Sequence, residues 1–79
     1  MRVSLTLSGP LRDHYRIRPY PKAETVCMPR GGSVGDLMNL YEISSENVHM
    51  ILVNRLKAET ETRLQDGDRV WLIPLAAGG

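Results

Sequence analysis

Only one segment of this sequence has the apolar spacing of a helix, and strand-like segments lie on both sides of it. Ser33 and Asp36 stand at the spacing of a capping box, just before this apolar pattern develops. One helix among several strands predicts an α+β fold in which the helix covers one face of a mixed sheet. The apolar residues predicted for the helix face are Val34, Leu37, Met38, Leu40 and Tyr41.

The first half of the chain predicts two antiparallel strands. Every second residue from Val3 to Leu7 is apolar, which is the pattern of a strand buried on one side. Gly9-Pro10 ends this strand, and residues 11–22 have the composition of a loop. A second strand is predicted over residues 23–28, and the connection is too short for the crossover that parallel pairing needs.

The second half predicts the rest of the sheet. The helix is expected to end at residues 44–47. Val48–Val53 is apolar except for His49, which predicts a strand buried on both faces at the centre of the sheet. Residues 56–64 are polar and predict a short edge strand or an extended loop. Asp66-Gly67-Asp68 signals a turn before a strand over residues 69–73, which Pro74 closes.

Length and charge exclude several classes of protein. A chain of 79 residues fits one small domain, which we expect over residues 1–74, with a mobile, exposed tail at 75–79. Ten Lys and Arg residues against nine Asp and Glu residues leave a net charge of +1. This balance gives no electrostatic basis for binding nucleic acid or an anionic membrane, and no apolar run is long enough to span a bilayer.

The cysteine, the histidines and the methionines are each interpreted first as structural residues. Cys27 is the single cysteine, which excludes an intramolecular disulfide and predicts a reducing, cytoplasmic location. We interpret it as a small core residue, with the role of nucleophile as the alternative. His14 and His49 lack a third ligand, so no metal site is predicted. The methionines predicted to fill the core are Met28, Met38 and Met50, with Met1 at its start.

The basic loop between Arg12 and Lys22 is a second binding candidate. It interleaves basic side chains with Tyr15 and Tyr20, a composition that could contact RNA or an acidic partner. The default interpretation is a solvated loop, and binding by this loop stays open at this point.

The feature that carries chemistry is the C-terminal pair Gly78-Gly79. A glycine end without Cβ atoms presents its carboxylate on a thin stalk, which suits a narrow active site. Transfer of AMP from ATP would turn that carboxylate into a mixed anhydride, open to attack by sulfur or by an amine. If Trp71 faces outward beside Ile73 and Leu75, an apolar docking patch lies next to this tail.

Three motifs in the second half of the chain belong together: Val53-Asn54, Leu64-x-Asp66-Gly67-Asp68-x-Val70, and Ile73-Pro74-x-Ala76-Ala77-Gly78-Gly79. As a set, they resemble the β-grasp fold of the ubiquitin-like sulfur carriers. The helix start at Gly32-Ser33-Val34-x-Asp36-Leu37 fits this family more weakly. The family includes the small subunit of molybdopterin synthase and the thiamine-biosynthesis sulfur carrier protein.

The resemblance implies a carrier rather than an enzyme. Gly79 would be adenylated by a partner of the ubiquitin-activating type, which uses ATP, and then converted to a thiocarboxylate, while Gly78 would give the stalk its reach. No bound cofactor is implied. Further partners would be a synthase large subunit or a thiazole synthase, and the molybdopterin branch is favoured over thiamine. Residues expected to bind partners are Trp71, Ile73, Leu75, Ala76 and Ala77.

Two alternatives belong to other functional classes. A ubiquitin-like modifier would use the same adenylation but would end in an isopeptide bond between Gly79 and a lysine of another protein. A plain interaction module would be indifferent to loss of the two glycines. The product distinguishes the first two, since only a carrier forms a thiocarboxylate.

Overall fold

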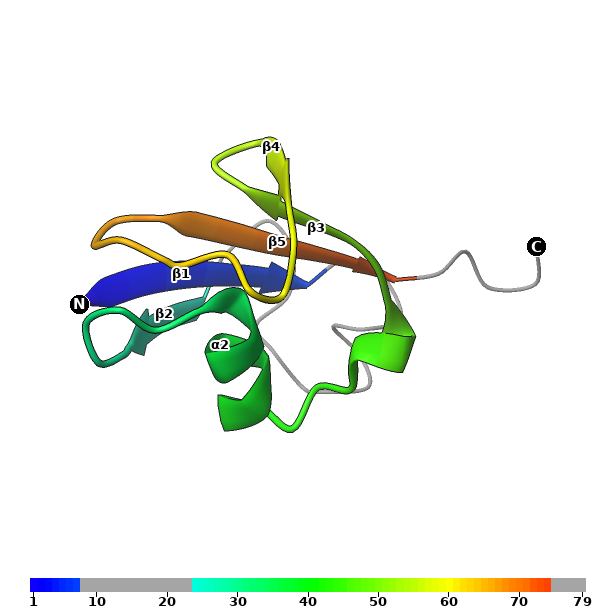
Figure 1. Ribbon diagram of the computed structural model, residues 1–79, viewed down its shortest axis with the longest axis horizontal. Coiled ribbons are helices and arrows are strands. Elements are labelled where there is room, and N and C mark those ends of the chain that lie inside the picture. Colours follow the sequence, from blue (N-terminus) through cyan, green and yellow to red (C-terminus); the bar gives the residue numbers. More distant parts are fainter. Residues whose placement is uncertain (8–23, 75–79) are drawn as a thin grey trace.

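The described part of the chain folds as a mixed sheet with the helix α2 (Val34–Leu40) packed on one face (Figure 1). The computed structural model describes residues 1–7 and 24–74. Within these ranges the predicted α+β fold with one covering helix is confirmed, and its strand order is that of a β-grasp sheet. The elements are β1 (Arg2–Leu7), β2 (Glu24–Cys27), α2 (Val34–Leu40), the 3-10 turn η1 (Ser45–Asn47), β3 (Val48–Val53), β4 (Leu56–Ala58) and β5 (Arg69–Pro74).

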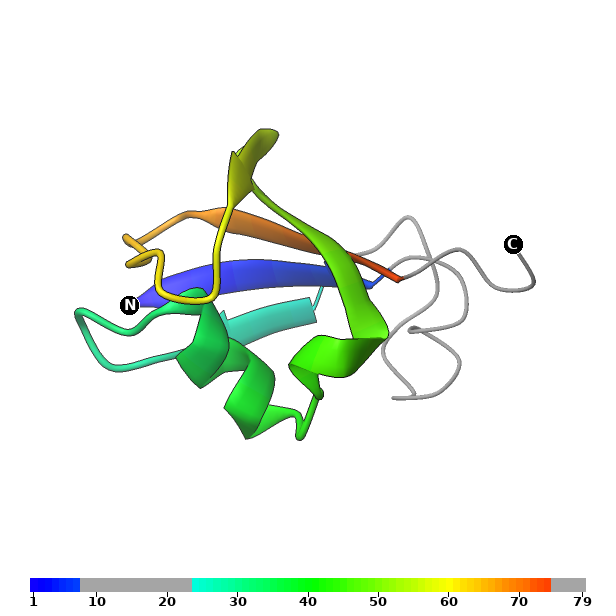
Figure 2. The ribbon, with the colours of Figure 1, turned by 45° about the vertical axis from the view of Figure 1, so that its right-hand side comes forward.

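The last strand, β5, occupies the middle of the five-stranded sheet, whose order is β2-β1-β5-β3-β4. It pairs in parallel with β1 and antiparallel with β3, so the sheet is mixed. β2 lies antiparallel to β1, as predicted from the short connection. Parallel pairing of β1 and β5 brings the ends of both strands to the same edge of the sheet (Figures 1 and 2).

The prediction that Val48–Val53 is a central strand buried on both faces is wrong. β3 lies between β5 and the edge strand β4, and Ile51 is its one buried residue. Because α2 covers one face of the sheet, residues of β3 on the other face have no helix of residues 1–7 or 24–74 above them. The strand is apolar on both sides, but one side is left open. Of the short edge strand and the extended loop predicted as alternatives for residues 56–64, the structure forms the strand, as β4 over Leu56–Ala58.

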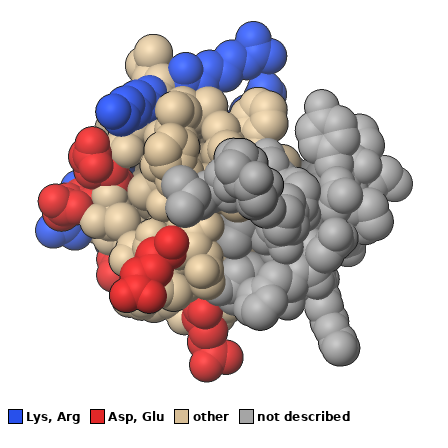
Figure 3. Space-filling model, turned by 90° about the vertical axis from the view of Figure 1, so that its right-hand side faces the viewer, with Lys and Arg blue, Asp and Glu red and all other residues tan. Residues whose placement is uncertain are grey.

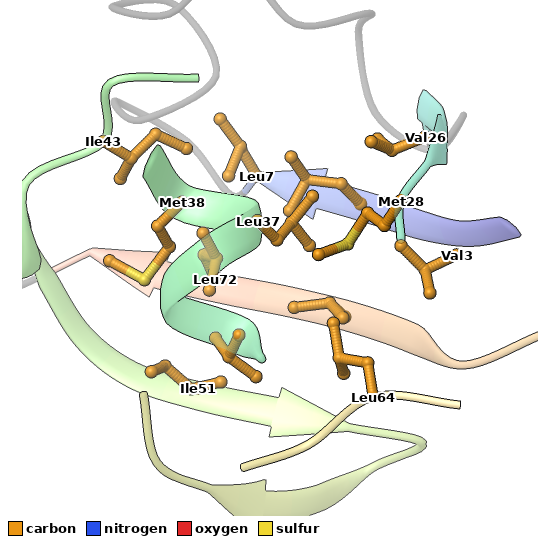
Figure 4. Packing of buried hydrophobic residues seen from close by; sticks show 13 residues of the cluster. Val3, Leu7, Val26, Met28, Leu37, Met38, Ile43, Ile51, Leu64 and Leu72 are labelled. Carbon is orange, nitrogen blue, oxygen red and sulfur yellow. The ribbon is translucent and has the colours of Figure 1, made fainter. Parts of the chain in front are cut away.

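The core lies between the sheet and α2 (Figure 4). Leu5, Leu37 and Leu72 are fully buried, and they come from β1, α2 and β5. Figure 4 shows Leu37 and Met38 of the helix among side chains of the strands. All thirteen buried core residues of the described ranges are apolar, and no buried side chain there is polar. The buried set is Val3, Leu5, Leu7, Val26, Met28, Val34, Leu37, Met38, Ile43, Ile51, Leu64, Val70 and Leu72.

Three side chains expected in the core are exposed instead. Leu40 is 58% exposed, because at 3.6 residues per turn its position lies to one side of the helix face that Val34, Leu37 and Met38 bury. Met50 and Cys27 lie on strands that have the predicted extended conformation, but they point to the face opposite the helix. Met28 and Met38 are buried as predicted, and Met1 packs against the core.

The start of α2 is fixed by the predicted capping box. The Ser33 Oγ accepts a hydrogen bond from the Asp36 N–H at 3.1 Å, and the Asp36 carboxylate accepts one from the Ser33 N–H at 2.9 Å. The helix ends at Leu40, before the predicted 44–47, because Glu42 takes a left-handed φ of 55° that a helix cannot continue. Tyr41 is the C-cap residue of α2 and lies near Glu24 of β2. Partial burial and the Glu24 carboxylate raise the pKa of Tyr41.

Asn54 joins the β3–β4 turn to the start of β5. Asn54 and Arg55 form the two-residue turn, and both have positive φ, as a type I′ hairpin turn requires. The Asn54 Nδ2 donates to Asp68 Oδ1 at 2.9 Å, and its Oδ1 accepts from the Arg69 N–H at 2.9 Å. Asn54 therefore fixes both the turn and the register of β3 against β5.

Replacement of Asn54 by Ala is expected to lower the free energy of unfolding by about 1–3 kcal/mol. The change removes both side-chain hydrogen bonds and places a Cβ-bearing residue without a polar side chain at positive φ. Urea unfolding monitored by circular dichroism measures the effect. Asn39→Ala, at an exposed helix position, is the matched control and should shift unfolding by less than about 0.5 kcal/mol. Equal shifts for the two variants would contradict the role of Asn54.

Candidate functional site

The open face of the sheet, opposite α2, carries an apolar patch. Trp71 and Ile73 alternate along β5 with the buried Val70 and Leu72, so they point away from the helix. On β3, Met50 and Leu52 flank the buried Ile51 and point the same way. We call these residues the open-face patch: Met50, Leu52, Trp71 and Ile73.

Strand pairing makes this patch continuous. Leu52 lies directly opposite Trp71, and Met50 lies opposite Ile73. Side chains of directly opposite residues on adjacent strands contact one another across the pair. Met50 is 36% exposed, and the other three side chains are half-buried. Contiguous apolar surface of this kind on a soluble domain is typical of a site that binds another protein.

The patch lies at the end of the sheet from which the chain continues to its C-terminus. Ile73 is followed by Pro74, the last residue of β5, and Pro74 pairs with Val48 at the start of β3. The predicted functional residues beyond this point, Leu75, Ala76, Ala77, Gly78 and Gly79, lie outside the described residues, as does the predicted tail at 75–79. Of the predicted partner-binding residues, the structure thus brings together Trp71 and Ile73.

Of the remaining candidates that the sequence offered, the structure describes His49 and Cys27 but not His14 or the basic loop. His49 is exposed at the irregularity in pairing between β3 and β5, and His14 and the basic loop of residues 12–22 lie outside the described residues. Within residues 1–7 and 24–74, no three His, Cys, Asp or Glu side chains gather as a metal site. Cys27 is exposed, on β2, and no described helix is long and apolar enough to cross a membrane.

Met50 and Leu52 are the patch residues that the sequence analysis missed. The apolar run of β3 was interpreted as a strand buried on both faces, so none of its residues was considered a surface candidate. Strict alternation around Ile51 separates two faces, but the sequence alone does not say which face a helix covers. The pairing of Leu52 with Trp71 supplies that information.

The comparison with known families identifies the chain. The model of the ThiS family matches residues 11–79, which is most of the sequence. The chain belongs to the ThiS family. This family consists of sulfur carriers, which are not catalysts, so the predicted membership and the prediction that the chain is a carrier rather than an enzyme are confirmed. Among curated proteins, none matches the chain.

Solved structures share the fold of this carrier. SAMP1 from Haloferax volcanii superposes with a TM-score of 0.75 at 18% identity, over 100% of both chains. A putative molybdopterin converting factor subunit 1 from Pyrococcus furiosus has a TM-score of 0.75 at 20% identity, over 96% of this chain and 99% of its own. A complex of subunits 1 and 2 of the molybdopterin-converting factor from Helicobacter pylori contains a chain with a TM-score of 0.64 at 20% identity, over 100% of both chains.

Proposed function

We propose that Gly79 is the reacting residue of this sulfur carrier. Its carboxylate attacks the α-phosphorus of ATP on a partner enzyme of the ubiquitin-activating type, pyrophosphate leaves, and the acyl-adenylate forms. A hydrosulfide ion then attacks the carbonyl carbon and AMP leaves, which yields a thiocarboxylate without any change of oxidation state. The observation that carries the proposal is a Gly78-Gly79 terminus on a chain of the ThiS family. Gly78 keeps the approach to the active site narrow, because it has no Cβ.

The open-face patch serves as the docking surface for the adenylating enzyme. Trp71 and Ile73 lie on the strand that leads directly into residues 75–79, so a protein seated on the patch holds the base of the tail. Large apolar side chains in a partly buried cluster are the residues that anchor most protein interfaces. Leu75, Ala76 and Ala77 continue the contact toward Gly79.

The acceptor of the sulfur is proposed to be the molybdopterin precursor, with the thiazole precursor of thiamine as the second candidate. The approach Ile73-Pro74-Leu75 resembles the molybdopterin branch. The fold shared with subunit 1 of the Helicobacter pylori complex supports a further partner, a synthase large subunit that receives the tail. In the thiamine branch the corresponding partner is a thiazole synthase.

Intact mass spectrometry tests the proposed chemistry. The protein is isolated from its own cells, or incubated with ATP, a sulfur donor and the adenylating enzyme of the same organism. The expected result is a gain equal to replacement of one oxygen by sulfur, located on Gly79 by fragmentation. A bare carboxylate under both conditions would contradict the proposal. A ladder of isopeptide-linked products in the cells would identify a protein modifier instead.

A further inference from the structure

All charged side chains that the described strands place on the open face are cationic. Arg2 on β1 and Arg69 on β5 stand in register with open-face neighbours, since Arg69 pairs with Ser4 and Arg2 lies two residues before Ser4. Lys57 on β4 pairs with Leu52 of the open-face patch. All three side chains are exposed. Glu24 is the one acidic residue on these strands, and its pairing with Leu5 places it on the helix side.

The helix side carries exposed acidic side chains together with the exposed Arg30 and Arg63. Asp36 belongs to α2, and Glu59 and Glu61 lie in the segment whose Thr60 and Thr62 carbonyl groups accept hydrogen bonds from the first residues of α2. In Figure 3, most basic side chains lie at the top of the molecule, where Figure 1 shows the β3–β4 hairpin, and most acidic side chains lie lower, with a basic group among them at the left. On the described strands the open face therefore carries charged side chains of one sign, whereas the helix side carries both signs. The exposed acidic residues on or near the helix side include Asp36, Glu42, Glu46, Glu59 and Glu61.

Along the strands, the open face changes from apolar side chains near the end of β5 to cationic side chains further from that end. Met50 and Ile73 form the row nearest the end of β5. The next row across the sheet contains Lys57, Leu52, Trp71 and Thr6, in that order. Arg69 and then Arg2 lie further from the end of β5, at successive steps of about 7 Å, the length of two strand residues. The apolar surface thus lies beside the tail, and the cations border it on the sides away from the tail.

We propose that the adenylating enzyme receives the open face on an acidic surface: Asp or Glu carboxylates lie opposite Arg69 and Lys57, and an apolar recess takes Trp71 and Ile73. This inference rests on the proposed function and adds the chemistry of the partner. An apolar centre bordered by charged groups is the usual anatomy of a protein interface. An acidic enzyme surface attracts the cations of the open face and so orients the carrier with its tail toward the active site.

The composition of the patch favours a protein over a nucleic acid as the occupant. Sites for single-stranded nucleic acid stack successive bases on several aromatic side chains. On the described open face, Trp71 is the one aromatic residue, and its patch neighbours Met50, Leu52 and Ile73 are aliphatic. Aliphatic side chains gain most from an apolar recess, which a protein provides and a phosphate backbone does not.

Charge reversal on the open face tests the inference. The variant Arg69→Glu/Lys57→Glu is compared with the wild-type carrier in adenylation by the enzyme of the same organism, followed as pyrophosphate release. We expect kcat/KM for the carrier to fall about tenfold or more at an ionic strength of about 0.1 M, with kcat unchanged at saturating carrier. The difference should shrink toward about 1 M salt, where the Debye length falls to about 3 Å.

Two further variants keep the comparison clean. Arg30→Glu makes the same charge change at an exposed position before α2, away from the open face, and should alter kcat/KM by less than about twofold. Arg69→Gln/Lys57→Gln removes the charges without reversing them and should give a smaller loss in the same direction. If the reversed variant fails to fold, as judged by circular dichroism, the Gln variant carries the test.

The outcomes separate this inference from the proposed function. A wild-type carrier that is never adenylated overturns the proposed function and the inference together. A wild-type carrier that is adenylated, with open-face variants no slower than Arg30→Glu, overturns the inference alone. Tight binding of a labelled single-stranded oligoribonucleotide by the wild-type protein, lost on charge reversal, would also overturn it, because the open face would then be a nucleic-acid surface.

Discussion

Removal of Gly79 is expected to abolish formation of both the adenylate and the thiocarboxylate while the fold is unchanged. The shortened chain still ends in a carboxylate, but that carboxylate lies about 3.5 Å further from the α-phosphate of ATP, the length of one extended residue. Displacement of reacting atoms by even 1 Å is costly, because the reaction depends on their alignment. Pyrophosphate release and intact mass with the adenylating enzyme measure the loss.

Two controls distinguish a misplaced C-terminal carboxylate from a loss of folding. The core of the described ranges runs from Val3 to Leu72, so the deletion removes no core residue, and the urea midpoint should equal that of the full chain. One Ala added after Gly79 displaces the carboxylate in the other direction and should abolish the reaction as well. A truncated chain that is adenylated at the wild-type rate, or one that no longer folds, would refute the assignment of Gly79.

The largest loss of stability is expected for Leu72→Ala, at about 2–5 kcal/mol. Leu72 is 0% exposed on the central strand, and it pairs with Leu7 on one side and Ile51 on the other. Its truncation opens a cavity where the strands meet α2, and the surrounding side chains relax into it only in part. For a domain this small, such a loss is a large fraction of the total free energy of unfolding.

Leu56→Ala is the matched control for this prediction. Leu56 is 72% exposed on the edge strand β4, so the same truncation removes little buried surface and should change stability by less than about 0.5 kcal/mol. Urea denaturation of both variants, monitored by far-ultraviolet circular dichroism, gives the comparison. Equal shifts in midpoint would mean that the core is not organised around β5.

Local sequence patterns predicted most of the elements. The spacing of Ser33 and Asp36 predicted the helix start, because the two hydrogen bonds of a capping box join residues three apart in the chain. The alternation in β1 predicted a strand with one buried side, and the short connection predicted its antiparallel pairing with β2. These features depend on residues that lie close together in the sequence, so the sequence alone is enough to predict them.

Predictions about which side is buried failed where they depended on distant residues. Cys27 and Met50 lie on strands that were correctly predicted, yet both point to the open face. Leu40 belongs to the helix but lies to one side of the face that packs on the sheet. An apolar side chain is buried only where another layer covers it, and among the described residues the short helix α2 covers one face of this sheet.

The candidate site also combines features that are local in the sequence with features that the tertiary structure makes. The proposed chemistry follows from local sequence features, since Gly78-Gly79 and the family motifs need no tertiary contact to be recognised. The proposed docking surface depends on the tertiary structure: β5 lies between β1 and β3, which sets Trp71 beside Leu52, with Arg69 and Lys57 on the same face. A terminal motif is local in the chain, whereas a surface patch is made by strand order, through pairing of residues far apart in the sequence.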